Sequence, residues 1–208
     1  MSLDYEQRYF DKKIRFVVGC DEAGRGPLAG PVVASAVILP RDYHNDLIND
    51  SKQMTDKTRR QAFIEIKENA IAIGVGIVSA EEIDKINIYQ ASRLAMEIAL
   101  RAIKHPYSVI LTDCMPLLGH EVPVDAIVHG DARAQCIAAA SIIAKVTRDD
   151  IMIELDKQYP VYGFAKHKGY PTKQHIEALM LHGPVPGLYR YTYGPVRVAA
   201  NKNLLLFK

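Results

Sequence analysis

The sequence has no apolar run long enough to cross a lipid bilayer, and its polar start from Met1 to Glu6 lacks the apolar stretch of a signal peptide. We therefore expect no membrane association and a cytoplasmic location. Cysteines are few, and Cys20, Cys114 and Cys136 form no CxxC pair, so neither a zinc ribbon nor a disulfide framework is indicated. Buried, reduced thiols are the simplest expectation for all three.

Acidic residues are scarce near the C-terminus. Residues 157–208 contain eight Lys or Arg and one acid, Glu177, so they carry +7, while residues 1–156 carry −5 of the overall charge of +2. The same stretch holds six of the eleven tyrosines. Basic residues interleaved with aromatic residues suit a nucleic-acid backbone with bases or sugars to stack on. A solvated basic face above core tyrosines explains the composition equally well.

The order of predicted elements indicates an α/β protein. A length of 208 residues, 49% of them hydrophobic, suffices for one domain with an appendage. Hydrophobic patterning predicts strands at 14–22, 31–39, 70–78, 107–113 and 124–128, and helices near 55–69, 80–84, 89–104, 131–159 and 172–182. No helix fits between the first two strands, which argues against a purely parallel, doubly wound sheet. We expect a five-stranded mixed sheet with helices on both faces.

Carboxylates occur where these strands end. Asp21 and Glu22 close the first strand, Asp113 closes the fourth, and Asp131 opens the long helix. Active sites of open α/β sheets lie at strand ends, and four converging oxygen donors would suit Mg²⁺ or Mn²⁺. Taken alone, Asp131 is equally well explained as a helix N-cap. Because neighbours on a strand point to opposite faces, Asp21 and Glu22 share a site only if the strand twists or ends there.

A glycine-rich turn follows the first pair of acids, with the sequence Gly24-Arg25-Gly26-Pro27-Leu28-Ala29-Gly30. One alternative is the phosphate-binding turn of a dinucleotide-dependent oxidoreductase, in which the glycines lead into a helix. Here Pro31 and the β-branched Val32-Val33 follow, which favours a second strand, and the spacing does not fit GxGxxG. The turn is therefore predicted to be a tight hairpin that a second backbone can approach closely.

Four segments together resemble ribonuclease HII: residues 21–34, the triplet Asp50-Ser51-Lys52, residues 130–149, and His167 to Thr172. The resemblance covers residues 14 to 198. It implies a ribonuclease H-like fold with a catalytic core at 1–158 and a C-terminal helical, basic and tyrosine-rich appendage at 159–208, packed on the same domain. It also implies metal-dependent cleavage of the RNA strand of RNA/DNA hybrids and incision 5′ of single ribonucleotides embedded in duplex DNA.

The resemblance also assigns residues. It makes Asp21, Glu22, Asp113 and Asp131 the catalytic, metal-binding carboxylates for two divalent ions, Mg²⁺ or Mn²⁺. It assigns substrate contacts to Gly24, Arg25 and Gly26 at the ribonucleotide and to Tyr170 at the next sugar, with phosphate contacts from Ser51, Lys52, Lys145 and Arg148. Cys114-Met115 replaces a Gly-Asn pair that is common in the family, which predicts a changed loop shape after Asp113.

The expected partners are RNA/DNA hybrid and ribonucleotide-containing duplex DNA, bound by a monomer. The segment Asn203 to Phe207 resembles the Gln-Leu-x-Leu-Phe peptides that dock on bacterial sliding clamps, with Asn in place of Gln. An apolar tail folded on its own domain is the alternative. Two further classes remain open from the sequence: a ribonuclease HIII-like enzyme, which would carry an additional N-terminal domain, and a non-catalytic hybrid-binding module.

Overall fold

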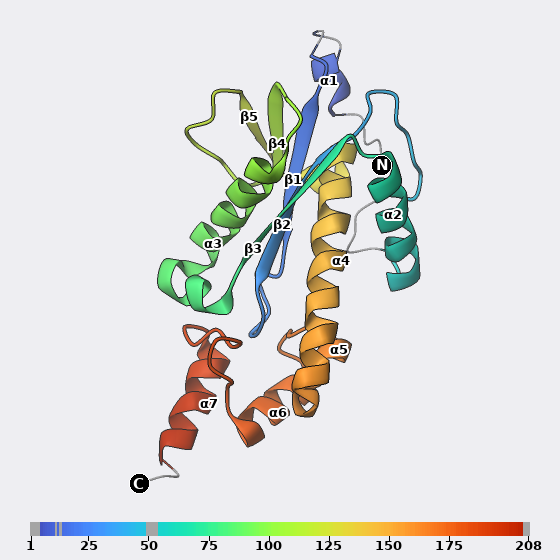
Figure 1. Ribbon diagram of the computed structural model, residues 1–208. Helices are drawn as coiled ribbons and strands as arrows, with labels where there is room; N and C mark the ends of the chain where they lie inside the picture. The colour runs from blue at the N-terminus through green and yellow to red at the C-terminus, as the bar shows by residue number, and fades with distance from the viewer. Residues whose placement is uncertain (1–4, 11, 13, 49–53, 206–208) are drawn as a thin grey trace. The chain divides into compact units, whose positions relative to one another are not determined.

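The computed structural model describes residues 5–10, 12, 14–48 and 54–205 (Figure 1). The strands are β1 (Val17–Ala23), β2 (Val32–Ile38), β3 (Ala72–Val78), β4 (Val109–Asp113) and β5 (Val124–Ile127). The α-helices are α1 (Gln7–Phe10), α2 (Asp56–Asn69), α3 (Ala80–Ala102), α4 (Gln135–Gln158), α5 (Phe164–His167), α6 (Lys173–His182) and α7 (Gly194–Leu205), with short 3-10 turns η1 (Gly130–Ala132) and η2 (Pro160–Tyr162). Within these ranges, none of the helices combines the length and apolar character needed to cross a bilayer.

The strands form one five-stranded sheet in the order β3-β2-β1-β4-β5. β1 runs antiparallel to β2 and parallel to β4, and β4 runs parallel to β5. The predicted mixed sheet is thus confirmed. Because β1, β4 and β5 are mutually parallel, their carboxyl ends meet at one edge of the sheet.

Packing divides the chain into two compact units. The first contains Met1–Ala23, Val33–Ile77 and Arg93–Val146, and the second contains Gly24–Val32, Val78–Ser92 and Thr147–Lys208. The first unit therefore holds most of the sheet and the first half of α4. The second holds the glycine loop, here defined as Gly24 to Gly30, together with the C-terminal helices.

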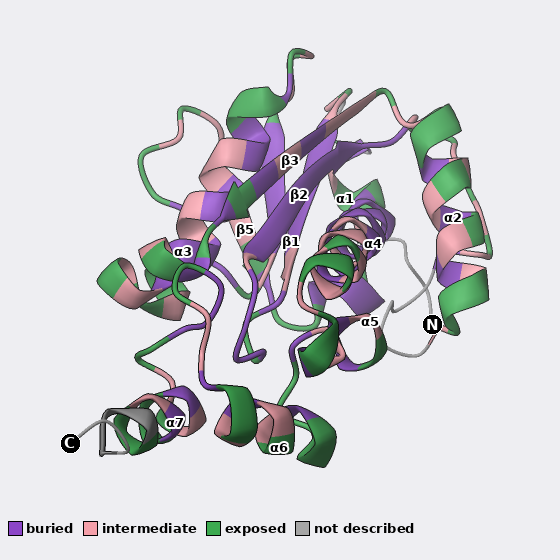
Figure 2. Ribbon diagram, turned by 60° about the horizontal axis from the view of Figure 1, so that its bottom comes forward, coloured by how far each residue is buried: buried purple, intermediate pink, exposed green. Residues whose placement is uncertain are grey.

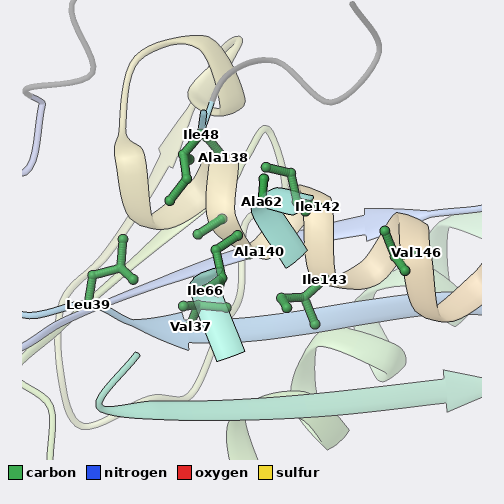
Figure 3. Close-up of a cluster of buried hydrophobic side chains, with 11 residues drawn as sticks. Val37, Leu39, Ile48, Ala62, Ile66, Ala138, Ala140, Ile142, Ile143 and Val146 are labelled. Atoms are coloured by element: carbon green, nitrogen blue, oxygen red, sulfur yellow. The ribbon is translucent and has the colours of Figure 1, made fainter. Parts of the chain in front are cut away.

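Helices cover both faces of the sheet in the first unit. On one face, Val37 of β2 packs with Ala62 and Ile66 of α2 and with the alanine-rich segment of α4 (Figure 3). α4 comes close enough for the Ser35 hydroxyl to donate to the Ala140 carbonyl at 2.7 Å. On the other face, the second half of α3 lies against β3, with Ala95 and Ala99 close to Gly76 and Gly74. β2 is consequently buried along its whole length (Figure 2).

α3 is interrupted at Asn87, whose φ of 67° and ψ of 165° are not helical. The Asn87 side-chain oxygen accepts the Gln90 N–H at 3.1 Å and so caps the second half of the helix. The sequence predicted two helices here, and the break falls between them. α7 was not predicted, because its residues include Pro195 and two valines and show little amphipathic pattern.

α4 begins at Gln135, four residues later than predicted, and Asp131 lies inside η1 instead of capping α4. The N-cap interpretation of Asp131 is therefore wrong. A distant residue supplies the capping charge: the buried Glu6 carboxylate accepts the N–H groups of Gln135 at 2.9 Å and Cys136 at 3.1 Å. A carboxylate at a helix N-terminus is stabilised by both hydrogen bonding and the helix dipole.

Replacing Glu6 with alanine should lower the free energy of unfolding by about 1–3 kcal/mol, because two buried N–H groups lose their charged acceptor. Urea denaturation followed by circular dichroism measures the change. Glu68→Ala is the matched control, since Glu68 is exposed on α2, and it should change stability by less than about 0.5 kcal/mol. Equal stability of the Glu6 and Glu68 variants would contradict the capping role.

Candidate metal centre and glycine loop

Three carboxylates from distant parts of the chain meet at the carboxyl edge of the sheet. Asp21, Asp113 and Asp131 each offer one ligand oxygen, and these atoms lie within 4.8 Å of one another. We call these residues the carboxylate cluster. The strand register explains the meeting, because Cys20 pairs with Thr112 and the next residues along the two parallel strands are Asp21 and Asp113.

Asp131 is brought to the cluster by the turn after β5. The Asp113 carboxylate accepts the Gly130 N–H at 2.8 Å, which fixes the start of η1 against the end of β4. The Asp131 side chain is buried, and that of Asp113 is partly buried. The arrangement therefore places acidic oxygens in a confined space with limited access to water.

Burial makes Asp21 costly to ionise. Its side chain is 3% exposed, and desolvation, followed by the neighbouring charges of Glu22 and Asp113, raises the pKa of Asp21 well above its usual range. Hydrogen bonds from Ser141 and from the Glu22 N–H, the latter at 2.7 Å, oppose this shift. A divalent cation would offset the repulsion between these carboxylates. Oxygen ligands at these separations suit a hard cation such as Mg²⁺ or Mn²⁺.

Glu22 is not among the residues whose ligand oxygens lie within 4.8 Å of one another. β1 continues to Ala23, with Glu22 paired to Ala34, so the strand neither ends nor breaks between Asp21 and Glu22. Alternation along the strand then directs the two side chains to opposite faces. Glu22 is still close enough to raise the pKa of Asp21. Of the four predicted ligands, the structure groups three.

Two left-handed residues flank the cluster. Cys114 and His129 both have φ of 55°, a region that glycine occupies without strain. The Cys114 N–H donates a hydrogen bond to the Ile127 carbonyl at 3.1 Å, which closes the loop after Asp113. Cys114 therefore bears a strained backbone conformation. Cys114 is also exposed, whereas Cys20 and Cys136 are buried, so the expectation of three buried thiols was wrong for Cys114.

The glycine loop belongs to the second unit, where it packs against the loop that carries Tyr170. Arg25 and Gly26 are exposed, and Gly24 and Pro27 on either side are buried. The Leu28 N–H donates to the Gly169 carbonyl at 2.8 Å. The Tyr170 ring is 41% exposed, and its edge would be 3.6 Å from a Cβ placed on Gly26. Gly26 and Tyr170 thus form one continuous exposed surface.

Arg148 does not lie where a phosphate contact would require it. Its side chain is fully buried, and it donates to the carbonyls of Pro31 at 2.9 Å, Ala29 at 3.1 Å and Lys168 at 2.9 Å. Burial, followed by the nearby charge of Arg190, lowers the pKa of Arg148 to about 10. We therefore revise the prediction: Arg148 joins the glycine loop to the Tyr170 loop. Lys145 is partly buried in α4, and Ser51 and Lys52 lie outside the described residues.

Two stacked histidines lie beside the loop that carries Tyr170, and one of them hydrogen-bonds to the Tyr170 backbone. The rings of His167 and His175 are 4.3 Å apart, and His175 donates through Nδ1 to the Tyr170 carbonyl at 2.9 Å. The Tyr189 hydroxyl lies 2.9 Å from Nε2 of the same ring. Burial lowers the pKa of His175 to about 4, and the hydrogen bond with the Tyr170 carbonyl only partly offsets this.

This histidine should make stability fall in acid. An unfolded histidine has a pKa of about 6.5, so its stabilising contribution is complete above that pH and is lost as the pH falls toward about 4, by at most about 3 kcal/mol. We expect His175→Gln to flatten the pH dependence of the melting temperature between these values. His44→Gln, at an exposed position, is the control, and a His175→Gln slope equal to that of wild type would contradict this assignment.

A sequence model of the family described as Ribonuclease HII matches residues 18–194. The chain belongs to the ribonuclease HII family. It is accordingly a nuclease of the ribonuclease H type. This membership excludes the oxidoreductase and the non-catalytic binding module, and it favours ribonuclease HII over ribonuclease HIII.

Relatives and solved structures agree with this assignment. Ribonuclease HII of Acholeplasma laidlawii is 50% identical over 195 residues, covering 94% of this chain and 95% of the relative. The crystal structure of ribonuclease H2 from Pyrococcus horikoshii OT3 aligns with a TM-score of 0.77 at 28% identity, over 90% of this chain and 98% of that one. A ribonuclease HII from Archaeoglobus fulgidus, solved in complex with PCNA, aligns with a TM-score of 0.70 at 25% identity, over 86% and 95%.

Proposed function

We propose that this ribonuclease HII hydrolyses the RNA strand of RNA/DNA hybrids and incises duplex DNA 5′ of a single embedded ribonucleotide. The observation that carries the proposal is the carboxylate cluster, whose three ligand oxygens lie within 4.8 Å of one another. Unpaired charges are costly in a buried place. A cluster of ionisable oxygens there therefore favours a function that uses a bound cation. The expected products carry 5′-phosphate and 3′-hydroxyl ends.

We assign the metal ligands to the carboxylate cluster, with Glu22 as the fourth ligand. When two Mg²⁺ or Mn²⁺ ions are bound, they supply water activation and charge stabilisation of the departing 3′-oxygen. Asp21 is held for this task by the bond from the Glu22 N–H, and Asp113 by the bond from the Gly130 N–H. Glutamate is one methylene longer than aspartate, which gives Glu22 the reach to fold back around the strand edge.

The glycine loop and Tyr170 are assigned to substrate recognition. Main-chain groups of Gly24, Arg25 and Gly26 would contact the ribonucleotide and its 2′-hydroxyl, and the exposed Tyr170 ring would stack on the following deoxyribose. Only the ribonucleotide carries a 2′-hydroxyl, and a ring packs closely only where that group is missing. The two elements would therefore read the RNA-to-DNA junction. Lys145 is assigned to phosphate binding.

The test is cleavage of a labelled duplex containing one ribonucleotide, assayed with Mg²⁺, with Mn²⁺ and with EDTA. An all-DNA duplex and an RNA/DNA hybrid serve as matched substrates. We expect cleavage of the ribonucleotide duplex and the hybrid with either metal, and none of the all-DNA duplex. Cleavage that persists in EDTA, or an inert ribonucleotide duplex, would overturn the proposal.

Replacing Tyr170 with alanine should reduce kcat/KM on the single-ribonucleotide duplex by about tenfold, the loss expected for one stacking contact of about 1–3 kcal/mol. Cleavage within a continuous hybrid should fall less, because it offers no deoxyribose at the next position. Tyr191→Phe, at another exposed tyrosine of the second unit, is the control. Equal losses on both substrates would argue against junction reading.

A sliding clamp is proposed as a protein partner. Support comes from the Asn203–Phe207 segment and from the Archaeoglobus fulgidus protein that was solved in complex with PCNA. Asn203 to Leu205 end α7, and Leu206 and Phe207 lie outside the described residues. Surface plasmon resonance on immobilised bacterial clamp should detect the full-length chain and not a variant ending at Ala200. Equal binding by the two proteins would show that this segment does not bind the clamp.

A further inference from the structure

The glycine loop turns its carbonyl groups toward the interior of the second unit. Two buried arginines donate hydrogen bonds to six backbone carbonyls of the loop and the residue after it. Their guanidinium groups donate to the carbonyls of Gly24, Arg25, Ala29, Gly30 and Pro31, and the Arg190 backbone N–H donates to the Leu28 carbonyl. Buried carbonyl groups require hydrogen-bond donors. The two arginines supply donors that the hairpin formed by the loop does not supply itself. One arginine, Arg148, was described above.

Arg190 makes most of these contacts. Its side chain is fully buried, and it donates to the Gly24 carbonyl at 2.6 Å and the Arg25 carbonyl at 2.9 Å. It also donates twice to the Gly30 carbonyl, at 2.9 and 3.1 Å. A planar guanidinium with several fixed donors can hold carbonyls from both ends of the loop at once, which an ammonium group cannot do with the same geometry.

Arg190 is itself held in place from two sides. The Tyr193 hydroxyl accepts from its Nη1 at 3.1 Å and donates to the Arg25 carbonyl at 2.7 Å. The Asp84 carboxylate accepts the N–H groups of Tyr191 at 2.6 Å and Thr192 at 2.9 Å, just after Arg190 in the chain. The guanidinium therefore has little freedom to follow the loop if the loop moves.

Peptide geometry links these contacts to the exposed side of the loop. In a planar trans peptide, the carbonyl of one residue and the N–H of the next point in opposite directions. The inward carbonyls of Gly24 and Arg25 therefore direct the N–H groups of Arg25 and Gly26 outward, and both residues are exposed. Two successive outward N–H groups make a compact donor site for an oxygen-rich ligand.

We propose that Arg190 is a positioning residue for ribonucleotide recognition, which orients the N–H groups of Arg25 and Gly26 toward the 2′-hydroxyl and adjoining phosphate of the substrate. The inference rests on the proposed function. It adds a buried side chain, remote in sequence from the glycine loop and without contact to the nucleic acid, that sets the preference for ribose over deoxyribose.

The test compares binding of two duplexes that differ by one 2′-hydroxyl, measured by fluorescence anisotropy in EDTA so that neither is cleaved. Arg190→Lys keeps the positive charge and loses the planar set of guanidinium donors. We expect the ratio of affinities for the ribonucleotide duplex and the all-DNA duplex to fall about tenfold, which corresponds to a loss of about 1.4 kcal/mol. Affinity for the all-DNA duplex should change less than about twofold. Arg197→Lys, an exposed Arg-to-Lys change on α7, should keep both affinities.

A folded Arg190→Lys variant that keeps the wild-type ratio overturns the inference. If that variant does not fold, Tyr193→Phe decides, because it removes the hydroxyl that joins Arg190 to the Arg25 carbonyl. The ribo-over-deoxy affinity ratio of this variant should fall, and a wild-type ratio counts against the inference. A wild-type protein that binds both duplexes equally refutes the proposed function itself, so the two failures are distinguishable.

Discussion

Asp21→Asn is expected to abolish turnover, with kcat lower by at least about 10³-fold, while binding of an RNA/DNA hybrid stays within about threefold of wild type. Asn keeps the shape of the side chain and can still accept the Glu22 N–H, but it removes one charge from the carboxylate cluster. Single-turnover cleavage and anisotropy measure the two quantities. Near-normal cleavage by this variant would refute the metal-ligand assignment.

The same variant offers a readout that is independent of activity. In EDTA, Asp21→Asn should be at least as stable as wild type, because burial disfavours the ionised Asp21 carboxylate. Added Mn²⁺ should raise the melting temperature of wild type and raise that of the variant less, since ligand binding stabilises the folded state. Asp125→Asn is the matched control, because Asp125 accepts the Tyr5 and Tyr9 hydroxyls and lies outside the cluster. Its metal response should equal that of wild type.

Gly26→Ala is expected to leave folding unchanged and to lower kcat/KM on the single-ribonucleotide duplex by about 10- to 100-fold, a loss of about 1.4–2.8 kcal/mol. Among the atoms that the structure describes, a Cβ at Gly26 would meet only the Tyr170 ring, at an ordinary 3.6 Å. The fold therefore does not require glycine here. A methyl group at this exposed position would instead obstruct the approach of the nucleic-acid backbone.

Gly24→Ala provides the contrast. Gly24 has φ of 101°, and a Cβ there would overlap Nε of Arg148, so this variant should lose at least about 2 kcal/mol of stability. Thermal melting and cleavage assays on both variants separate a structural glycine from a functional one. Wild-type kinetics for Gly26→Ala would show that the substrate does not approach the loop at this position.

The sheet and its acidic edge were predictable because they depend on local patterns. Apolar runs end at Asp21 and Asp113, and the short glycine turn leaves no room for a helix between the first two strands, which excluded a purely parallel sheet. Asp131 was expected to open the long helix, but α4 begins at Gln135 and is capped by Glu6, which is 129 residues away in sequence. Such a long-range capping partner leaves no local signal.

The buried arginines show the limit of sequence reasoning more clearly. Arg190 lies in the basic, tyrosine-rich stretch at residues 157–208, and the family resemblance assigned Arg148 to phosphate binding, so both were expected at or near an exposed surface. Their burial follows from the demand of the glycine loop for donors, which appears only when the loop packs against residues far along the chain. The glycine- and proline-rich loop was the one sequence signal for this demand, because its carbonyl groups have no partners in the sheet.

The separation of Asp21, Asp113 and Asp131 along the chain also bears on how the cell makes this nuclease. A growing polypeptide emerges from the ribosome in order, so it cannot complete the carboxylate cluster until residue 131 has been released and the parallel strands have paired. Because ligand sets of this kind do not exist before folding, partial chains gain no metal-dependent activity. Any metal-dependent cleavage by this chain therefore begins only after residue 131 has been synthesised.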